Sequence, residues 1–382
     1  MALSVESSSA QHISRLDVLR AAAFLAVFTF HISGSFPFFK LTWTGVFLDY
    51  SAWPKETLFL LPVSFGWLGV ALFFVLSGFC IHYSTLRRKT AFTTPDFYWR
   101  RFLRIYPAYI VCLIVVTILS PWLPIRYFNF WQIASHVLMV HNFFKATFFG
   151  LNGVLWSLGV ETQFYLLYPL LIYLVHRRMS WSQCLVMALI FNIFFQIYFS
   201  LTAEAYAMTP VRTTWSFPLV TWCDWILGAC LAEAYVKKEP VFRREGLWLA
   251  GSGIMLIIAL NIRTLNVQAY LFSSVFFAVL MQRYLSIQAP LNRIERGLVP
   301  VGLVSYSLYL WHQPILLLLD EWASAHHLYT TPLRQAFIEV VAGTAFLAPI
   351  AVISYYLFEI GAPAWIRAAC AKRELAAVAD AT

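Results

Sequence analysis

Long apolar runs separated by short polar segments dominate this chain. Runs of about 18 or more apolar residues have the length of a helix that crosses the core of a bilayer. Ten such runs can be drawn, at 16–36, 62–85, 103–120, 155–175, 181–200, 215–236, 246–263, 266–285, 298–319 and 334–358. The pattern predicts an all-α membrane protein of about ten transmembrane helices.

The basic residues lie mostly in the short loops, and their distribution predicts the orientation. If the N-terminus is cytoplasmic, seven Lys and Arg fall in outer segments and the other 20 of the 27 fall in cytoplasmic ones. Cytoplasmic loops of membrane proteins carry such an excess, so both termini are expected in the cytoplasm. The two longest outer loops, roughly 37–61 and 121–154, are rich in Phe, Trp and Pro and are expected to lie on the membrane surface.

Composition agrees with this class and excludes others. The chain is 60% hydrophobic and 12% charged, about half the charge of a soluble domain. The net charge of +9 comes from basic residues in the short loops, so it does not indicate a nucleic-acid partner. Six cysteines without paired spacing indicate neither a disulfide nor a metal site. We expect one domain over 1–366 and a short cytoplasmic tail over 367–382.

The first apolar run contains charged and polar residues, which are energetically unfavourable inside a membrane and therefore indicate a function or a partner. Arg20 and His31 are eleven residues apart, so they share a helix face, with His31 about 16 Å deeper. Asp17 is three residues before Arg20 and is placed to pair with it. The alternative is an arginine at the membrane interface and a histidine that only packs.

The next two spans carry further candidates. Ser77 and Gly78 are small residues that let helices approach closely, so a packing role is expected. Arg100, Arg101 and Arg104 cluster near the start of the third span, where three guanidinium groups would suit a phosphate. On these residues alone, ordinary anchoring by positive charge is the simpler interpretation.

Polar groups recur in the fourth and ninth spans. Glu161 and Gln163 fall in the first two turns of the fourth span, just after Trp156, and such groups should face a polar cavity. Tyr309 and His312 lie three residues apart in the ninth span. Anchoring by aromatic residues at the interface is the alternative for both groups.

Taken together, these segments resemble acyltransferase family three, bacterial membrane enzymes that O-acylate sugars of surface polysaccharides, Nod factors and macrolides. The resemblance rests on the following stretches: Arg20 and His31, Gly-Val-Ala-Leu-Phe-Phe-Val-Leu-Ser-Gly-Phe at 69–79, Arg-Arg-Phe-Leu-Arg-Ile-Tyr-Pro-Ala-Tyr at 100–109, Trp-Ser-Leu-Gly-Val-Glu-Thr-Gln-Phe-Tyr at 156–165, and Ser-Tyr-Ser-Leu-Tyr-Leu-Trp-His at 305–312.

Two departures from the family pattern affect what it implies. The family often ends its last helix with Glu-x-Pro, whereas this chain reads Glu359-Ile-Gly-Ala-Pro363, so a role for Glu359 is left open. Many members carry a C-terminal hydrolase-like domain, and this chain resembles the stand-alone type without it.

The resemblance implies an O-acyltransferase of the bacterial cytoplasmic (inner) membrane. It would use acetyl-CoA or another acyl-CoA as donor, with no metal, and a hydroxyl of a sugar or lipid-linked glycan as acceptor. His31, with Arg20 and Glu161, would be catalytic, acting as a base or as an acyl relay. The donor would bind Asp17, Arg100, Arg101 and Arg104, and the acceptor would bind Trp156, Gln163, Tyr309 and His312.

These roles predict one continuous polar cavity lined by His31 and Glu161, with the donor entering from the cytoplasm and the acceptor from outside. The competing hypothesis is a transporter or flippase for a glycan or lipid-linked intermediate, since intramembrane charge also marks transport pathways. Transporters usually have related halves, and no such halves are visible in this sequence.

Overall fold

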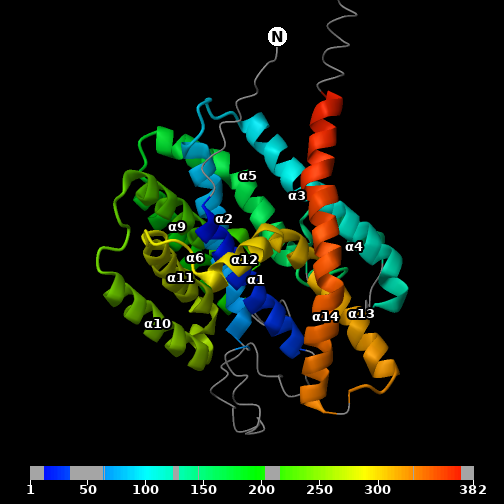
Figure 1. Cartoon of the computed structure of the whole chain (residues 1–382). Coiled ribbons are helices and arrows are strands. Elements are labelled where there is room, and N and C mark those ends of the chain that lie inside the picture. The colour runs from blue at the N-terminus through cyan, green and yellow to red at the C-terminus, as the bar shows by residue number, and fades with distance from the viewer. Residues whose placement is uncertain are drawn as a thin grey trace, which may run out of the picture.

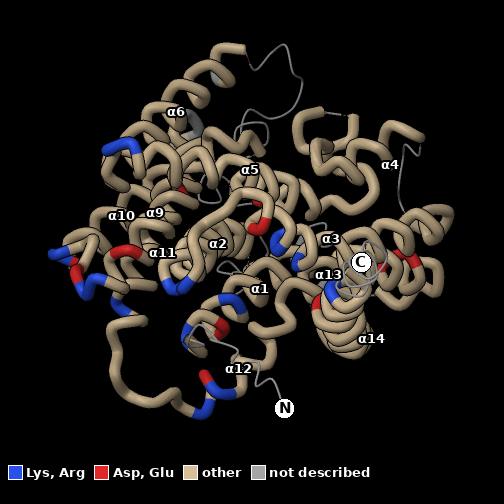
Figure 2. Tube along the Cα trace, turned by 90° about the horizontal axis from the view of Figure 1, so that it is seen from above, with Lys and Arg blue, Asp and Glu red and all other residues tan. Residues whose placement is uncertain are grey.

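The computed structural model describes residues 13–34, 63, 65–123, 129–144, 146–202, 216–329 and 331–370. All regular structure in this part of the chain is helical, so the predicted all-α class is confirmed. The long helices pack side by side in a bundle, with α2 (Gly69–Leu86) near its middle (Figures 1 and 2). The predicted outer loop at 37–61 lies outside the described residues.

Each predicted span contains a long helix. In chain order these are α1 (Ser14–Gly34), α2, α3 (Thr94–Leu119), α5 (Trp156–His176), α6 (Trp181–Leu201), α9 (Pro218–Lys237), α10 (Glu245–Asn261), α11 (Ala269–Leu285), α13 (Ser305–Ala325) and α14 (Pro332–Ser354). Shorter elements join them: η4 (Ser120–Trp122), α4 (Phe130–Val137), η5 (His141–Phe143), η6 (Arg263–Gln268), α12 (Arg293–Leu303) and the π-helix η7 (Tyr355–Gly361).

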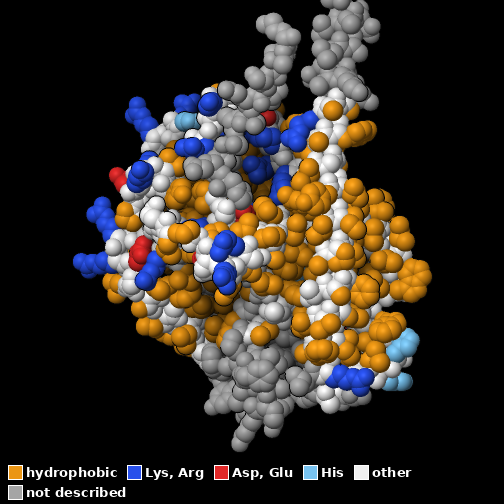
Figure 3. All heavy atoms as spheres, viewed as in Figure 1, with side chains coloured by type: hydrophobic (Ala, Val, Ile, Leu, Met, Phe, Trp, Pro, Cys, Tyr) orange, Lys and Arg blue, Asp and Glu red, His pale blue; other side chains and the backbone are white. Residues whose placement is uncertain are grey.

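Within the described residues, six helices are long and apolar enough to cross a membrane, or seven if a bent pair counts as one span. This is fewer than the ten spans predicted. The apolar helices α10 and α11 have 17 residues each, and α1 carries Arg15, Asp17 and Arg20 in its first two turns. A broad apolar surface covers α14 and its surroundings (Figure 3), where Phe337 and Tyr356 are more than half exposed. The chain is an integral membrane protein.

The bent pair corrects the predicted ninth span. Instead of one straight helix over 298–319, α12 and α13 meet at Val304 and are bent by 73°. A Cβ added to Gly302 would lie 1.9 Å from the backbone oxygen of Asp17. Glycine therefore lets α12 lie directly across α1 before the chain turns into the membrane helix α13 (Figure 1).

Close packing through glycine also joins α2 to α9. A Cβ on Gly78 would lie 1.9 Å from the backbone oxygen of Trp225, and one on Gly228 would lie 2.0 Å from that of Val75. The two backbones touch at this level, as small residues allow in membrane helices. Gly78 thus has the packing role expected from the sequence, and it holds the adjacent Ser77 in place.

The helix boundaries differ from prediction at two more places. α3 begins at Thr94 rather than 103, and helical structure continues from α14 through η7 to Cys370. The predicted tail 367–382 therefore begins inside a helix. The start of α1 and the end of this last helix both lie toward the upper end of the molecule in Figure 1.

Candidate active site

A cavity of about 160 Å³, which we call the arginine cavity, lies between α1, α2, α3, α5 and α13. Its polar lining is Arg20, Ser77, Cys80, Arg101, Arg104, Ser157, Glu161, Tyr165, Ser305, Tyr306 and Tyr309. Figure 2 shows basic positions in the middle of the bundle, between α1, α3 and α5. Three guanidinium groups and one carboxylate belong to this lining, and the guanidinium groups offer hydrogen-bond donors suited to an anion.

Arg20 is held toward the cavity by two neighbours. Its Nη1 donates to Oδ1 of Asp17 at 2.6 Å, and its Nη2 donates to Sγ of Cys80 at 3.0 Å. The Asp17 side chain is 1% exposed and does not line the cavity. Asp17, which we predicted as a donor-binding residue, is thus placed to orient Arg20.

The third helix brings two arginines into the cavity. Nη1 of Arg104 lies 3.3 Å from Oε2 of Glu359, and Oε1 of Glu359 accepts a hydrogen bond from Ser307 at 2.6 Å. Nε of Arg101 is buried without a hydrogen-bond partner among the described residues. Glu359, whose role the sequence left open, lies in the π-helix η7 and is the counter-ion of Arg104.

Arg100, which the resemblance placed in the donor site, lies outside the arginine cavity. It forms an ion pair with Asp96 one turn earlier, and Asp96 also pairs with Arg88 at 2.8 Å. Arg100 lies on the same helix face as Arg104 but pairs with Asp96 outside the cavity. Its neighbour Arg101 lines the cavity instead.

Glu161 lies on α5 opposite the arginines. Its Oε1 accepts hydrogen bonds from Ser77, at 2.6 Å, and from the hydroxyl of Tyr165. Ser77 in turn accepts from Nε1 of Trp225 at 3.2 Å. Ser77, for which the sequence predicts a packing role, therefore also orients the Glu161 carboxylate.

His31 lines a second and smaller cavity of about 70 Å³, which we call the His31 cavity. Its walls are mostly aromatic: Phe30, Trp67, Phe148, Phe149, Trp156, Tyr270 and Tyr309, with Gln313 as a further polar group. Trp156 stacks on Phe148 with ring centroids 6.0 Å apart. Trp156 and Tyr309, two of the predicted acceptor residues, thus line the same cavity as His31.

The contacts of His31 select one tautomer. Its Nδ1 lies 2.8 Å from the carbonyl oxygen of Val27 and 3.4 Å from Nε2 of His312. Nδ1 of His312 lies 2.7 Å from the carbonyl oxygen of Tyr309, which requires a proton on that nitrogen. Nε2 of His312 is then an acceptor, so both partners of His31 Nδ1 are acceptors. His31 carries its proton on Nδ1 and keeps the lone pair of Nε2 for chemistry.

Two of the predicted acceptor residues lie elsewhere. His312 is fully buried behind His31 and lines neither cavity. Gln163 exchanges hydrogen bonds with the side chain of Asn142, at 2.9 and 3.1 Å, and donates to the carbonyl of Met139. Gln163 therefore fastens the segment 139–142 to α5 and does not face a cavity.

The single cavity predicted from the sequence is also wrong. Glu161 lines the arginine cavity and His31 lines the His31 cavity, and the two linings share Val70 and Tyr309. The groups that we expected to meet in one space thus line two cavities that have these two residues in common.

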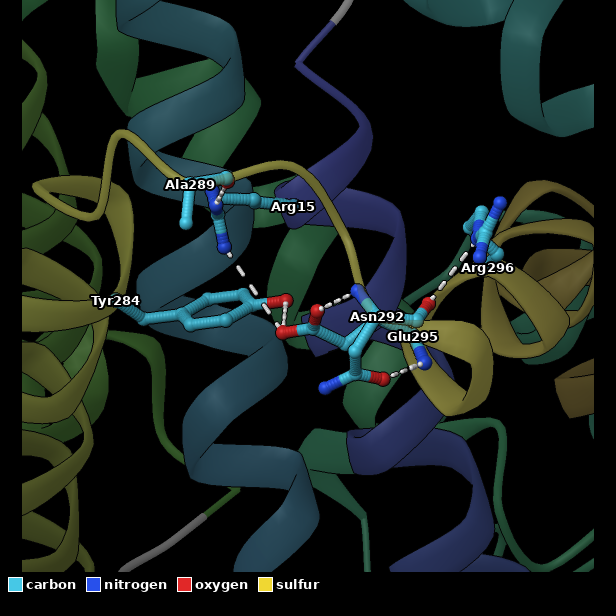
Figure 4. Close-up of polar contacts among 6 residues, drawn as sticks. All are labelled: Arg15, Tyr284, Ala289, Asn292, Glu295 and Arg296. Atoms are coloured by element: carbon cyan, nitrogen blue, oxygen red, sulfur yellow. Dashed lines mark hydrogen bonds and ion pairs between the residues drawn. The ribbon is translucent and has the colours of Figure 1, made fainter.

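A polar network surrounds the start of α12 (Figure 4). Asn292 and Glu295 form a capping box, with bonds of 2.9 and 2.6 Å. Glu295 also accepts from the hydroxyl of Tyr284 at 2.7 Å and faces Arg15, which lies over the Tyr284 ring. These contacts tie α12 to α1 and α11, upstream of Ser305 and Tyr306 in the cavity wall.

Sequence reasoning missed several lining residues, among them Val70, Cys80, Tyr165 and Tyr306. Helical spacing contained a signal for two of them: Cys80 follows Ser77 by three residues and Tyr165 follows Glu161 by four, so each pair shares a face. Tyr306 donates to the backbone oxygen of Ile105 at 2.8 Å, a tertiary contact that no spacing predicts.

Comparison with known proteins gives a consistent result. The profile of the Acyltransferase domain family matches residues 13–358. The chain is 25% identical to the Peptidoglycan O-acetyltransferase OatA of Listeria monocytogenes over 81% of its length and 50% of that protein. It is 29% identical to the Acyltransferase MdmB of Streptomyces mycarofaciens over 65% of its length and 62% of that protein.

The O-acetyltransferase OatA of Staphylococcus aureus is 24% identical over 92% of this chain and 57% of its own length. The chain thus spans between half and two thirds of the curated relatives that it matches. No solved structure matches the chain significantly.

Proposed function

The chain belongs to the family of the Acyltransferase domain, and from this premise we propose that it is an O-acyltransferase that uses acyl-CoA. The donor is acetyl-CoA, and the acceptor is a hydroxyl of a sugar or glycan. Two relatives carry the name O-acetyltransferase, one of them for peptidoglycan, which supports this choice of acyl group and acceptor class.

The observation that carries the proposal is the set of guanidinium groups of Arg20, Arg101 and Arg104 in one cavity. Acyl-CoA is an anion with several phosphate groups, and guanidinium binds phosphate through paired hydrogen bonds. Arg101 keeps a buried Nε without a partner in the described structure, and a phosphate oxygen would supply one. The arginine cavity is accordingly the donor site.

His31 performs the chemistry in this scheme. Its Nε2 takes the proton of the acceptor hydroxyl, whose oxygen attacks the thioester carbonyl. A C–O bond forms, the C–S bond breaks, and coenzyme A leaves as a thiolate that recovers the proton. The alternative uses the same lone pair as a nucleophile: Nε2 takes the acyl group from the thioester and passes it to the hydroxyl. Both routes produce one ester and one free coenzyme A.

The acceptor occupies the aromatic side of the site. Trp156 and Tyr309 line the same cavity as His31, and a sugar offers apolar ring faces together with hydroxyl groups. Gln313 adds an amide for hydrogen bonding. A cavity with aromatic walls and few polar groups suits a sugar better than it suits a charged acceptor.

The test uses the purified full chain in lipid vesicles, with radiolabelled acetyl-CoA and a soluble peptidoglycan fragment as probes. We expect acetyl transfer to the fragment together with release of free coenzyme A. His31→Ala should abolish both activities, since it removes the base, while insertion and abundance in the membrane stay unchanged.

The control is His176→Ala, which removes a histidine that lines neither cavity. Its activity should match that of the unaltered chain. Activity of His31→Ala within threefold of that level would reduce His31 to a packing residue. A quenched single turnover that traps labelled acetyl on the protein would distinguish the relay from the base.

A further inference from the structure

The two cavities have two lining residues in common. Val70 of α2 and Tyr309 of α13 line both the arginine cavity and the His31 cavity. If the proposed function is correct, the acyl group is bound as a thioester in the arginine cavity and reacts beside His31 in the other. On its way to His31 the acyl group would then pass Val70 and Tyr309, the residues common to both linings.

Tyr309 is the fixed member of this pair. Its hydroxyl lies 2.6 Å from Oγ of Ser157 and donates to the carbonyl of Val154 at 3.2 Å. Its ring packs edge-on against Phe73, with ring centroids 5.8 Å apart, and lies 5.4 Å from the ring of His312. The side chain is 6% exposed, so it has neither space nor a hydrogen-bonding reason to swing aside.

Val70 is the member that a substitution can resize. It lies in the first turn of α2, two turns before Ser77 on the same helix face. Its branched side chain makes no hydrogen bond, so its size alone determines how far it extends toward Tyr309. One methyl group more or less at this position changes the width of the passage.

The sizes of the two cavities indicate that short acyl groups are favoured over long ones. The His31 cavity, at about 70 Å³, has less than half of the 160 Å³ of the arginine cavity. Large aromatic side chains wall the smaller cavity: Phe30, Trp67, Phe148 and Trp156. A group that passes this pair enters a confined space that the acceptor must also share.

We propose that Val70 and Tyr309 form a size filter, which admits short acyl groups such as acetyl to His31 and rejects longer straight-chain acyl groups. The inference rests on the proposed function and adds what determines its acyl specificity. The reaction is unchanged: the thioester C–S bond breaks, the ester C–O bond forms, and the proton of the acceptor ends on coenzyme A.

The test compares acetyl-CoA with butyryl-CoA in the vesicle assay, with the ratio of the two kcat/KM values as the readout. Val70→Ala should raise the butyryl-to-acetyl ratio by about tenfold or more, the scale of discrimination by one or two carbons in an apolar pocket. Val70→Ile should lower the ratio below that of the unaltered chain, because it adds a methyl group at the same position.

Val75→Ala is the matched control. Val75 is a fully buried valine of the same helix that lines neither cavity. It loses the same two methyl groups and should leave the ratio within about twofold. If Val70→Ala fails to fold, the shift expected for Val70→Ile decides the question, since that variant keeps the branched side chain.

The outcomes separate the filter from the function. Acetyl transfer with the same ratio in the Val70 variants and in Val75→Ala would overturn the filter and leave the proposed function standing. An unaltered chain that transfers no acyl group from any acyl-CoA would overturn the proposed function, and the filter with it.

Discussion

At the scale of single residues, the placement of His31 depends on a second histidine. His312 is fully buried and lines neither the arginine cavity nor the His31 cavity, yet its Nε2 lies 3.4 Å from Nδ1 of His31. An imidazole inside a membrane protein acts as a base only if the correct nitrogen carries the lone pair, and the hydrogen bond of the other nitrogen determines which one does. His312 and the carbonyl of Val27 together provide that bond.

We therefore expect His312 to be a positioning residue. His312→Phe keeps a buried ring but removes the acceptor nitrogen, so kcat should fall by about tenfold or more while the KM for acetyl-CoA stays nearly constant. His312→Gln offers an amide oxygen in the same direction and should recover part of the activity. A higher KM for the acceptor at unchanged kcat would instead support the acceptor-binding role that the sequence suggested.

The arginines offer a comparison within a single helix. Arg104→Ala should raise the KM for acetyl-CoA, because a charge-assisted hydrogen bond to phosphate contributes roughly 1.5–3 kcal/mol, equivalent to about a ten- to hundredfold change. Arg100→Ala is the control, since Arg100 pairs with Asp96 outside the cavity. Steady-state kinetics with varied acetyl-CoA measure both. Equal donor KM values in the two variants would mean that the arginines only anchor the helix in the membrane.

At the scale of helices, apolar periodicity was a good guide where a helix is straight and a poor one where a tertiary contact shapes it. Every predicted span contains a long helix because burial of some twenty apolar residues is a local property of the chain. The bend between α12 and α13 depends on Gly302 meeting the backbone of Asp17, nearly three hundred residues away in sequence. No local pattern contains that contact.

The same distinction holds for the site. The family resemblance assigned Arg20, Arg101, Arg104 and Glu161 to one site, and all four line the arginine cavity. Spacing did not show that Asp96 holds Arg100 aside. The division of the site into two cavities depends on how α2 and α13 approach each other, which an analysis of single helices does not reach.

Two glycines of α12 give a direct test of its packing. Gly302→Ala should destabilise the protein strongly, since its Cβ would fall 1.9 Å from a backbone oxygen that has no room to retreat. Gly297→Ala adds the same methyl group where nothing lies within 4 Å and should be neutral or slightly stabilising, because alanine favours a helix by up to about 1 kcal/mol over glycine. Thermal unfolding in detergent measures both. Equal melting temperatures would contradict the close contact of α12 with α1.

The segment of α4 and η5 contains a buried pair of histidines. The rings of His136 and His141 stack with centroids 4.0 Å apart. Burial lowers the pKa of His136 to about 4 and lowers that of His141 well below its usual value, with His136 as the second cause. The folded state thus favours the neutral form of both rings. The contribution of this pair to the stability of the folded protein is complete above the unfolded pKa of about 6.5 and is lost as the pH falls from there toward 4.

We expect the melting temperature to fall by a few degrees between pH 7.5 and pH 5, in part through this pair. The double variant His136→Phe, His141→Phe keeps two stacked rings without a titrating group and should show a smaller fall. The matched control is His326→Gln with His327→Gln, which alters two exposed histidines and should leave the fall unchanged. An equal fall in both double variants would exclude the buried pair as a cause.

At the scale of the whole molecule, the arginines and His31 lie at different depths along the bundle. Arg20 lies about 9 Å by helix rise from the start of α1, and His31 lies about 16 Å further along the same helix. The arginine cavity is therefore closer to the end of the bundle at which α1 begins. If that end is cytoplasmic, it is also the side on which a cell supplies acyl-CoA, and His31 lies toward the opposite face.

The orientation itself is the last prediction, with ten crossings and both termini in the cytoplasm. Figure 1 places the start of α1 and the end of the last helix in the upper half of the molecule, an arrangement compatible with an even number of crossings. Reporter fusions after residues 90, 240 and 375 should report the cytoplasm, and fusions near 50 and 325 should report the outside. An outside signal at 375 would remove one crossing, and an outside signal at 90 and 240 together would invert the bundle and present the arginines to a compartment without acyl-CoA.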